Sequence, residues 1–95
     1  MSSEFNKRTG WEKLRAICQA QGLKATRQRI EILRAVCRAK DHPSADAVYR
    51  QVKKQLPAIS FDTVYRTLNS LEEHKLISRV HYLDDKSRYD PDLSE

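Results

Sequence analysis

The sequence predicts a mainly α fold, with four helices followed by a two-stranded antiparallel β-hairpin. Apolar residues recur at helical spacing in four successive segments, which are bounded by capping residues, a glycine or prolines. From residue 76 onward the period changes from helical to alternating, which is typical of strands. The chain has 95 residues, enough for one small domain with a single core.

The first two helices are expected after residues 1–10, a polar segment that we predict to be a flexible N-terminus. Gly22 can cap the first helix in the left-handed conformation, and Thr26 can cap the start of the second. Cys18 and Cys37 lie in the apolar stripes and lack metal-ligand spacing, so we expect free interior thiols. The stripes contain Trp11, Leu14, Ile17 and Cys18 in the first helix, and Ile30, Leu33, Val36 and Cys37 in the second.

The third helix is expected to begin after Ser44 and to close at Pro57, and the fourth to begin after Ser60 and run to about His74. The third carries the stripe Ala45, Val48, Val52 and Leu56. At 100° per residue, the fourth gathers Phe61, Val64, Thr67, Leu68 and Leu71 on its apolar face, and Asp62, Tyr65, Arg66, Asn69 and Glu73 on its polar face.

The hairpin is expected as a strand over 76–83, a turn over 84–87 and a returning strand from Arg88 to Asp90. The third and fourth helices, joined by residues 57–60, have the form of a helix-turn-helix, and a basic hairpin after the second of them is a wing. The wing carries Arg79, Lys86 and Arg88. The predicted fold is therefore a winged helix-turn-helix over residues 11–86.

A nucleic-acid partner is favoured by the charge and by the polar face of the fourth helix. The 18 Lys and Arg residues outnumber 13 Asp and Glu, for a formal charge of +5. Arg66 can donate two hydrogen bonds to guanine, Tyr65 can pack on thymine methyls or bond a phosphate, and Asn69 suits adenine or a backbone oxygen. The same face could instead be ordinary solvated surface, or a protein-interaction surface anchored by Tyr65.

Other function classes have less support. The sequence contains no nucleophile–base pair, glycine-rich phosphate loop or complete metal set, so we do not expect an enzyme. It has no run of 18 apolar residues and no signal-peptide pattern, so we expect a cytoplasmic protein without a membrane partner.

Four motifs, in this order and spacing, resemble the DNA-binding half of the ferric uptake regulator family over about residues 13–94. They are GLKATRQR at 22–29, HPSADAVY at 42–49, SFDTVYRTL at 60–68 and SRYD at 87–90. The resemblance implies a metal-dependent bacterial repressor that binds double-stranded A/T-rich palindromic DNA as a homodimer. It places Tyr65 and Arg66 on bases and Lys24 near the minor groove. The DNA-binding residues that we predict are Lys24, Arg27, Ser60, Thr63, Tyr65, Arg66, Asn69 and Arg88.

The resemblance also implies a regulatory Fe(II), Mn(II) or Zn(II) site between two domains, with His42 and Asp90 as the matching ligands. Aspartate at position 90 is similar to the peroxide-sensing branch of the family, whereas iron sensors more often have glutamate. His74 and His81 match no ligand position and are expected on the surface.

The chain departs from the family pattern after residue 90. Residues 87–95 match the end of the wing and the start of a hinge, and neither a histidine-rich segment nor the C-terminal dimerisation domain with its structural zinc follows. We therefore expect a DNA-binding fragment that is monomeric or weakly associated and binds no regulatory metal tightly by itself.

Overall fold

The computed structural model describes residues 8–39, 42–81 and 87–91. Within these residues, four helices precede a two-stranded antiparallel sheet, as predicted. The helices are α2 (Arg8–Ala20), α3 (Arg27–Arg38), α4 (Ala45–Lys53) and α5 (Phe61–Glu73), and the strands are β1 (Ile77–His81) and β2 (Ser87–Pro91). Within the described residues no helix has the length and apolarity needed to cross a bilayer.

Helix ends follow the predicted capping chemistry. Thr26, Ser44 and Ser60 each accept a hydrogen bond through the side-chain oxygen from the backbone N–H three residues later, at 3.1–3.2 Å. Gly22 has a φ of 78°, and its N–H donates to Gln19 while the N–H of the next residue donates to Cys18. This pair of hydrogen bonds defines a Schellman cap, in which the left-handed position favours glycine.

Two helix boundaries differ from the prediction. Helix α2 begins at Arg8, so residues 8–10 are helical although the sequence assigned them to the flexible tail. Helix α4 ends at Lys53, before Leu56, and the connection to α5 is therefore longer than the predicted 57–60. The Val52 carbonyl accepts from the N–H groups of both Gln55 and Leu56 in a closing turn. Pro57 disfavours helical geometry at Leu56, so the chain does not continue as a helix beyond this turn.

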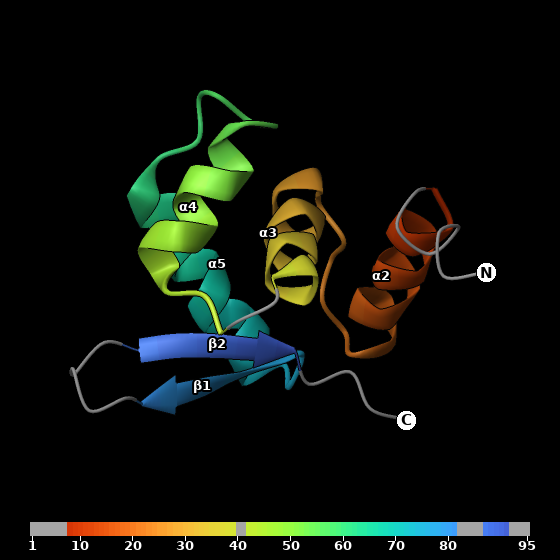
Figure 1. Ribbon diagram of the computed structural model, residues 1–95. Helices are drawn as coiled ribbons and strands as arrows, with labels where there is room; N and C mark the ends of the chain where they lie inside the picture. Colours follow the sequence, from red (N-terminus) through yellow and green to blue (C-terminus); the bar gives the residue numbers. More distant parts are fainter. Residues whose placement is uncertain (1–7, 40–41, 82–86, 92–95) are drawn as a thin grey trace.

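Helix α3 is the centre of the fold. In Figure 1 it lies between α2 on one side and α4 and α5 on the other, with the hairpin below. Its residues Ile30, Ile32, Leu33 and Val36 are all fully buried, and it packs against α2, α4, α5 and β2. A helix in contact with several neighbours needs a broad apolar face.

The hairpin pairs β1 with β2 so that Arg79 lies opposite Tyr89 and Ile77 opposite Pro91. Tyr89 is fully buried, and the cation of Arg79 lies 5.6 Å from the centre of its ring. The predicted turn and Lys86 lie outside the described residues, except for Ser87, which begins β2.

Both cysteines are free thiols, as predicted. Cys18 is buried and Cys37 is half-buried. Burial and the neighbouring Cys18 raise the pKa of the Cys37 thiol to about 11, so the unreactive protonated form is retained at neutral pH.

Candidate nucleic-acid interface and metal ligands

The solvent-facing side of α5 carries Tyr65 and Arg66, as the sequence predicted. Tyr65 is 40% exposed although it is a large aromatic residue, and the Arg66 side chain is 80% exposed. The opposite side of the helix buries Val64, Leu68 and Leu71. Helix α5 therefore presents an aromatic ring and a guanidinium group next to each other, outside the core.

Phe61 was predicted on the apolar face of α5, and this was wrong. It occupies the first position of the helix and is 43% exposed. Its ring stacks on Tyr65 at 6.3 Å between centroids and meets the edge of Tyr49 from α4 at 5.7 Å. The three rings form what we call the aromatic row: Tyr49, Phe61 and Tyr65.

Arg66 is paired with a residue that sequence reasoning did not assign to the site. Its Nε lies 3.1 Å from Oδ2 of Asp62, one turn earlier on α5, and the Asp62 side chain is 72% exposed. Opposite charges at i and i+4 on a predicted helix are the sequence signal that could have identified this pair. The bond costs little to break in water, so Arg66 can exchange Asp62 for another acceptor.

Asn69, a predicted DNA contact, and Arg79, a residue of the predicted wing, are joined to each other. The Nη2 of Arg79 donates to Oδ1 of Asn69 and also lies 3.1 Å from Oε1 of Glu72. The Arg79 side chain is only 23% exposed and lies over the ring of Tyr89. We call this group the Arg79 cluster: Asn69, Glu72, Arg79 and Tyr89. Arg79 thus anchors β1 to α5, and one of the acceptor positions of the Asn69 amide is used within the protein.

The Tyr89 hydroxyl lies at the bottom of the Arg79 cluster. It is buried and makes no hydrogen bond within the described residues. Burial raises the pKa of Tyr89, and the nearby Arg79 cation lowers it to a smaller extent. The ring is therefore a neutral core residue under the charged side chain.

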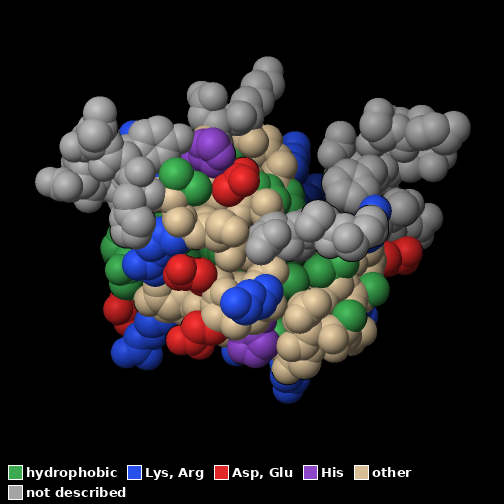
Figure 2. Space-filling model, turned by 90° about the horizontal axis from the view of Figure 1, so that it is seen from below, with side chains coloured by type: hydrophobic (Ala, Val, Ile, Leu, Met, Phe, Trp, Pro, Cys, Tyr) green, Lys and Arg blue, Asp and Glu red, His purple; other side chains and the backbone are tan. Residues whose placement is uncertain are grey.

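The other predicted contacts lie near the N-terminal ends of α3 and α5, and on β2. Lys24 and Arg27 are exposed, and the Lys24 carbonyl accepts a 3.0 Å hydrogen bond from Arg29. At the start of α5, the Ser60 hydroxyl donates to Oγ1 of Thr63 at 2.9 Å. Arg88 is half-buried, and its Nη1 lies 3.5 Å from the His42 carbonyl oxygen. Figure 2 shows that basic, acidic and histidine side chains are interspersed on the hairpin side of the molecule.

The structure brings His42 and Asp90 together although they are far apart in sequence. The N–H of Tyr89 donates to the Pro43 carbonyl at 3.0 Å, and Ser44 forms a β-bridge with Arg88. This pairing places Nε2 of His42 3.4 Å from Oδ1 of Asp90, with both side chains about half exposed.

The geometry of this pair fits a shared cation. Tetrahedral ligands at about 2.1 Å from a metal are roughly 3.4 Å apart, and an imidazole with a carboxylate suits iron, manganese or zinc. Among the residues that the structure describes, no group of three or more His, Cys, Asp and Glu side chains could hold a metal. His42 and Asp90 are thus two candidate ligands of an incomplete set.

The other two histidines were predicted on the surface. The Nδ1 of His74 lies 2.8 Å from the carbonyl oxygen of Ser70 at the end of α5. The side chain of His81 lies outside the described part of the chain.

Comparison with known proteins gives the family. The sequence profile of the ferric uptake regulator family matches residues 20–95. This chain belongs to the ferric uptake regulator family. Among curated relatives, the ferric uptake regulation protein of Rhizobium leguminosarum bv. viciae is 36% identical over 77 residues, which cover 81% of this chain and 54% of the relative. The peroxide-responsive repressor PerR of Staphylococcus aureus (strain Mu50) is 33% identical over 79 residues, which cover 83% of this chain and 53% of the relative.

Solved structures of the ferric uptake regulator family confirm the winged-helix fold. A zinc-bound manganese uptake regulator matches with a TM-score of 0.79 and 34% identity, over 86% of this chain and 62% of that one. The Helicobacter pylori ferric uptake regulator, a protein with three functional metal-binding sites, matches with a TM-score of 0.72 and 30% identity. The match covers 88% of this chain and 56% of that one. The chain spans about half the length of the curated relatives that it matches. These relatives are regulators, in agreement with the prediction that the chain is not an enzyme.

Proposed function

We propose that this chain is the DNA-binding domain of a metal-responsive transcriptional repressor that acts in the cytoplasm. The observation that carries the proposal is the exposed pair Tyr65 and Arg66 on α5, the second helix of the helix-turn-helix. Arg66 has the donor geometry for guanine O6 and N7, and the Tyr65 ring can pack on thymine methyls. Lys24 and Arg27 supply positive charge for phosphates, which gives affinity without sequence choice.

The DNA target that we propose is an A/T-rich palindrome, with one copy of the domain on each half-site. In the intact protein a homodimer would place two α5 helices in successive major grooves. Tethering raises the effective concentration of the second copy, so this chain alone is expected to be monomeric or weakly associated and to bind a half-site weakly. Its binding should also fall steeply with salt.

Selection from a randomised duplex pool, followed by anisotropy titration of the selected and a shuffled duplex, tests the proposal. Arg66→Ala should cost about 1–3 kcal/mol on the selected duplex and relax base preference. Lys24→Ala, the matched control, should weaken both duplexes evenly. Equal losses on both duplexes for Arg66→Ala would contradict the base-reading role.

A regulatory metal is the second part of the proposal. His42 and Asp90 would supply an imidazole and a carboxylate to Fe(II), Mn(II) or Zn(II), and a cation there would fix the hairpin relative to the segment before α4. Further ligands and a structural zinc would come from a C-terminal domain. Aspartate at position 90 supports the peroxide-sensing branch, whereas the relatives include both iron regulators and PerR.

Titration calorimetry of this chain with each of the three metals tests the incompleteness of the site. Two ligands are too few for a stable site, so we expect no tight one-to-one binding. A site of micromolar affinity or better that is lost in both His42→Ala and Asp90→Ala would show that the chain holds the metal alone.

A protein-interaction surface is the competing function, and the aromatic row favours it. Phe61 and Tyr65 are both at least 40% exposed, and exposed aromatics are frequent at interface hot spots. A gel shift at low salt distinguishes the two functions, since a winged helix that binds only protein should leave the duplex unshifted.

A further inference from the structure

Phe61 is the exposed member of the aromatic row that the proposed DNA contacts leave unused. It lies one turn before Tyr65 on α5 and is 43% exposed. The two rings are nearly parallel, with 6.3 Å between their centroids and 20° between their planes. The row therefore extends the Tyr65 surface by a second ring toward the N-terminal end of α5.

Neighbouring side chains hold the Phe61 ring in place. Tyr49 of α4 meets this ring at 5.7 Å between centroids and 82° between planes. The Tyr49 hydroxyl in turn accepts a 3.0 Å hydrogen bond from Lys53, whose ammonium group lies 5.2 Å from the centre of the Tyr49 ring. A ring with neighbours on two sides loses little conformational freedom when it binds a partner, so the row is preorganised for contact.

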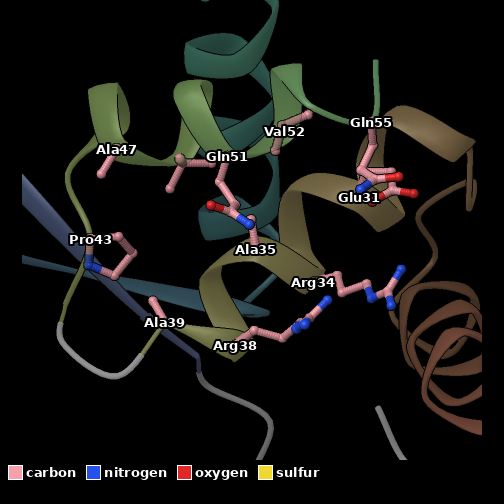
Figure 3. A pocket seen from close by; sticks show the side chains of 11 residues that line it. Glu31, Arg34, Ala35, Arg38, Ala39, Pro43, Ala47, Gln51, Val52 and Gln55 are labelled. Atoms are coloured by element: carbon pink, nitrogen blue, oxygen red, sulfur yellow. The ribbon is translucent and has the colours of Figure 1, made fainter. Parts of the chain in front are cut away.

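The shape of the surface at the row favours a large partner. The groove between α3 and α4 in Figure 3 has a volume of about 410 Å³, and the described residues that line it include Arg34, Arg38 and Gln51 but no ring of the row. Small-molecule sites are concave, whereas Phe61 and Tyr65 are each at least 40% exposed. The row is therefore suited to a macromolecule that lies across it.

The charges beside the row favour DNA as that macromolecule. Lys53 lies at the Tyr49 end, and Arg66 follows Tyr65 directly in the chain, so a cation stands at each end of the row. The carboxylate of Asp62 on the same turn of α5 is paired with Arg66, which offsets its charge. Cations around an apolar strip fit a surface on which phosphates border the base edges.

We propose that Phe61 reads the C5 methyl group of a second thymine, separate from the thymine that Tyr65 contacts. A phenyl ring has no hydrogen-bonding group, and the thymine methyl is the apolar group that base edges present in the major groove. The N-terminal residues of a recognition helix contact base edges, and Phe61 is the first residue of α5. Four residues span about 6 Å of helix and stacked bases are about 3.4 Å apart, so the two rings reach bases about two steps apart. This inference rests on the proposed binding of DNA by α5.

Anisotropy titration of the 95-residue protein with the selected duplex tests the inference, using a set of duplexes that each carry deoxyuridine in place of one thymidine. Deoxyuridine lacks the methyl group and keeps the hydrogen-bonding edge of thymine. Loss of a contacted methyl should weaken binding about three- to fourfold. We expect at least two sensitive positions. Phe61→Ala should abolish the response at one of them and keep the other, and Tyr65→Ala should do the reverse.

Phe61→Leu is the matched variant, because it keeps an apolar side chain and removes the ring that stacks on Tyr65. It should keep the response that Phe61→Ala loses, whereas a residue that only orients Tyr65 would lose its effect in both variants.

The inference is overturned if Phe61→Ala responds to every deoxyuridine as the unchanged chain does, or if Phe61→Ala and Tyr65→Ala lose the same position. Arg66→Ala separates the two proposals. A normal loss of affinity in Arg66→Ala beside unchanged binding by Phe61→Ala would leave the proposed function in place and assign the row to a protein partner. Failure of the chain to bind any duplex would overturn both.

Discussion

Arg66 and Arg79 are two arginines of the predicted winged helix, one on the fourth helix and one in the wing, and their surroundings in the structure differ. The Arg66 side chain is 80% exposed, and within the described residues it is paired with Asp62 on its own helix. Arg79 is 23% exposed, contacts both Asn69 and Glu72, and covers the Tyr89 ring. A positive charge in a predicted wing is therefore not by itself a DNA contact. The surroundings of the guanidinium group decide whether it recognises a ligand or joins two elements.

The stability of the two alanine variants should separate these roles most clearly. Arg79→Ala removes a charge-assisted hydrogen bond, a half-buried ion pair and a cation–ring contact, so we expect a loss of about 2 kcal/mol in the free energy of unfolding. Arg66→Ala should change stability by less than about 0.5 kcal/mol, because its pair is exposed. Urea denaturation followed by circular dichroism measures both, and equal losses would break the comparison.

Removal of Asp62 should sharpen the role of Arg66. Asp62→Asn weakens the Asp62–Arg66 pair and removes a negative charge next to the proposed DNA surface. We therefore expect affinity for any duplex to rise by about 0.5–1 kcal/mol at low salt, with base preference retained. Asp46→Asn is the matched control, since Asp46 pairs with Arg50 at the same i,i+4 spacing on α4. An equal gain for both variants in anisotropy titrations would exclude a specific role for Asp62.

Tyr89→Phe should have the smallest effect at neutral pH. The hydroxyl has no partner within the described residues, so we expect stability to be unchanged or to rise by up to about 1 kcal/mol. Tyr49→Phe is the control, because the Tyr49 hydroxyl accepts a 3.0 Å bond from Lys53. A loss above about 1 kcal/mol for Tyr89→Phe would indicate a bound water on the hydroxyl.

The same variant gives a pH test. The folded pKa of Tyr89 is raised above its ordinary value, so the unfolded state ionises first and the native chain loses stability as pH rises beyond about 10. The Phe variant lacks this titration. Its stability relative to the native chain should therefore increase above that pH, and an unchanged difference would contradict the raised pKa.

Local chemistry explains which features of the fold could be predicted. The caps at Thr26, Ser44 and Ser60 and the left-handed Gly22 depend on residues within a few positions, and all four are confirmed. The predicted end of α4 was wrong. Apolar periodicity continues to Leu56, whereas the helix ends at Lys53 and a closing turn follows it.

Contacts between distant segments could not be predicted in the same way. The 3.4 Å approach of His42 to Asp90 depends on the pairing of the 42–44 segment with β2. Phe61 has helical spacing suited to the core, yet it lies exposed at the first position of α5, and its ring stacks on Tyr65.

The sequence by itself determined the order of helices and strands, their caps and the outward direction of Tyr65 and Arg66, because helical periodicity and side-chain-to-backbone bonds act over three or four residues. Only the tertiary structure decided that Arg79 holds β1 to α5 and that His42 lies beside Asp90. These outcomes depend on which surfaces of separate elements meet, and packing of α3 among its neighbours sets that arrangement.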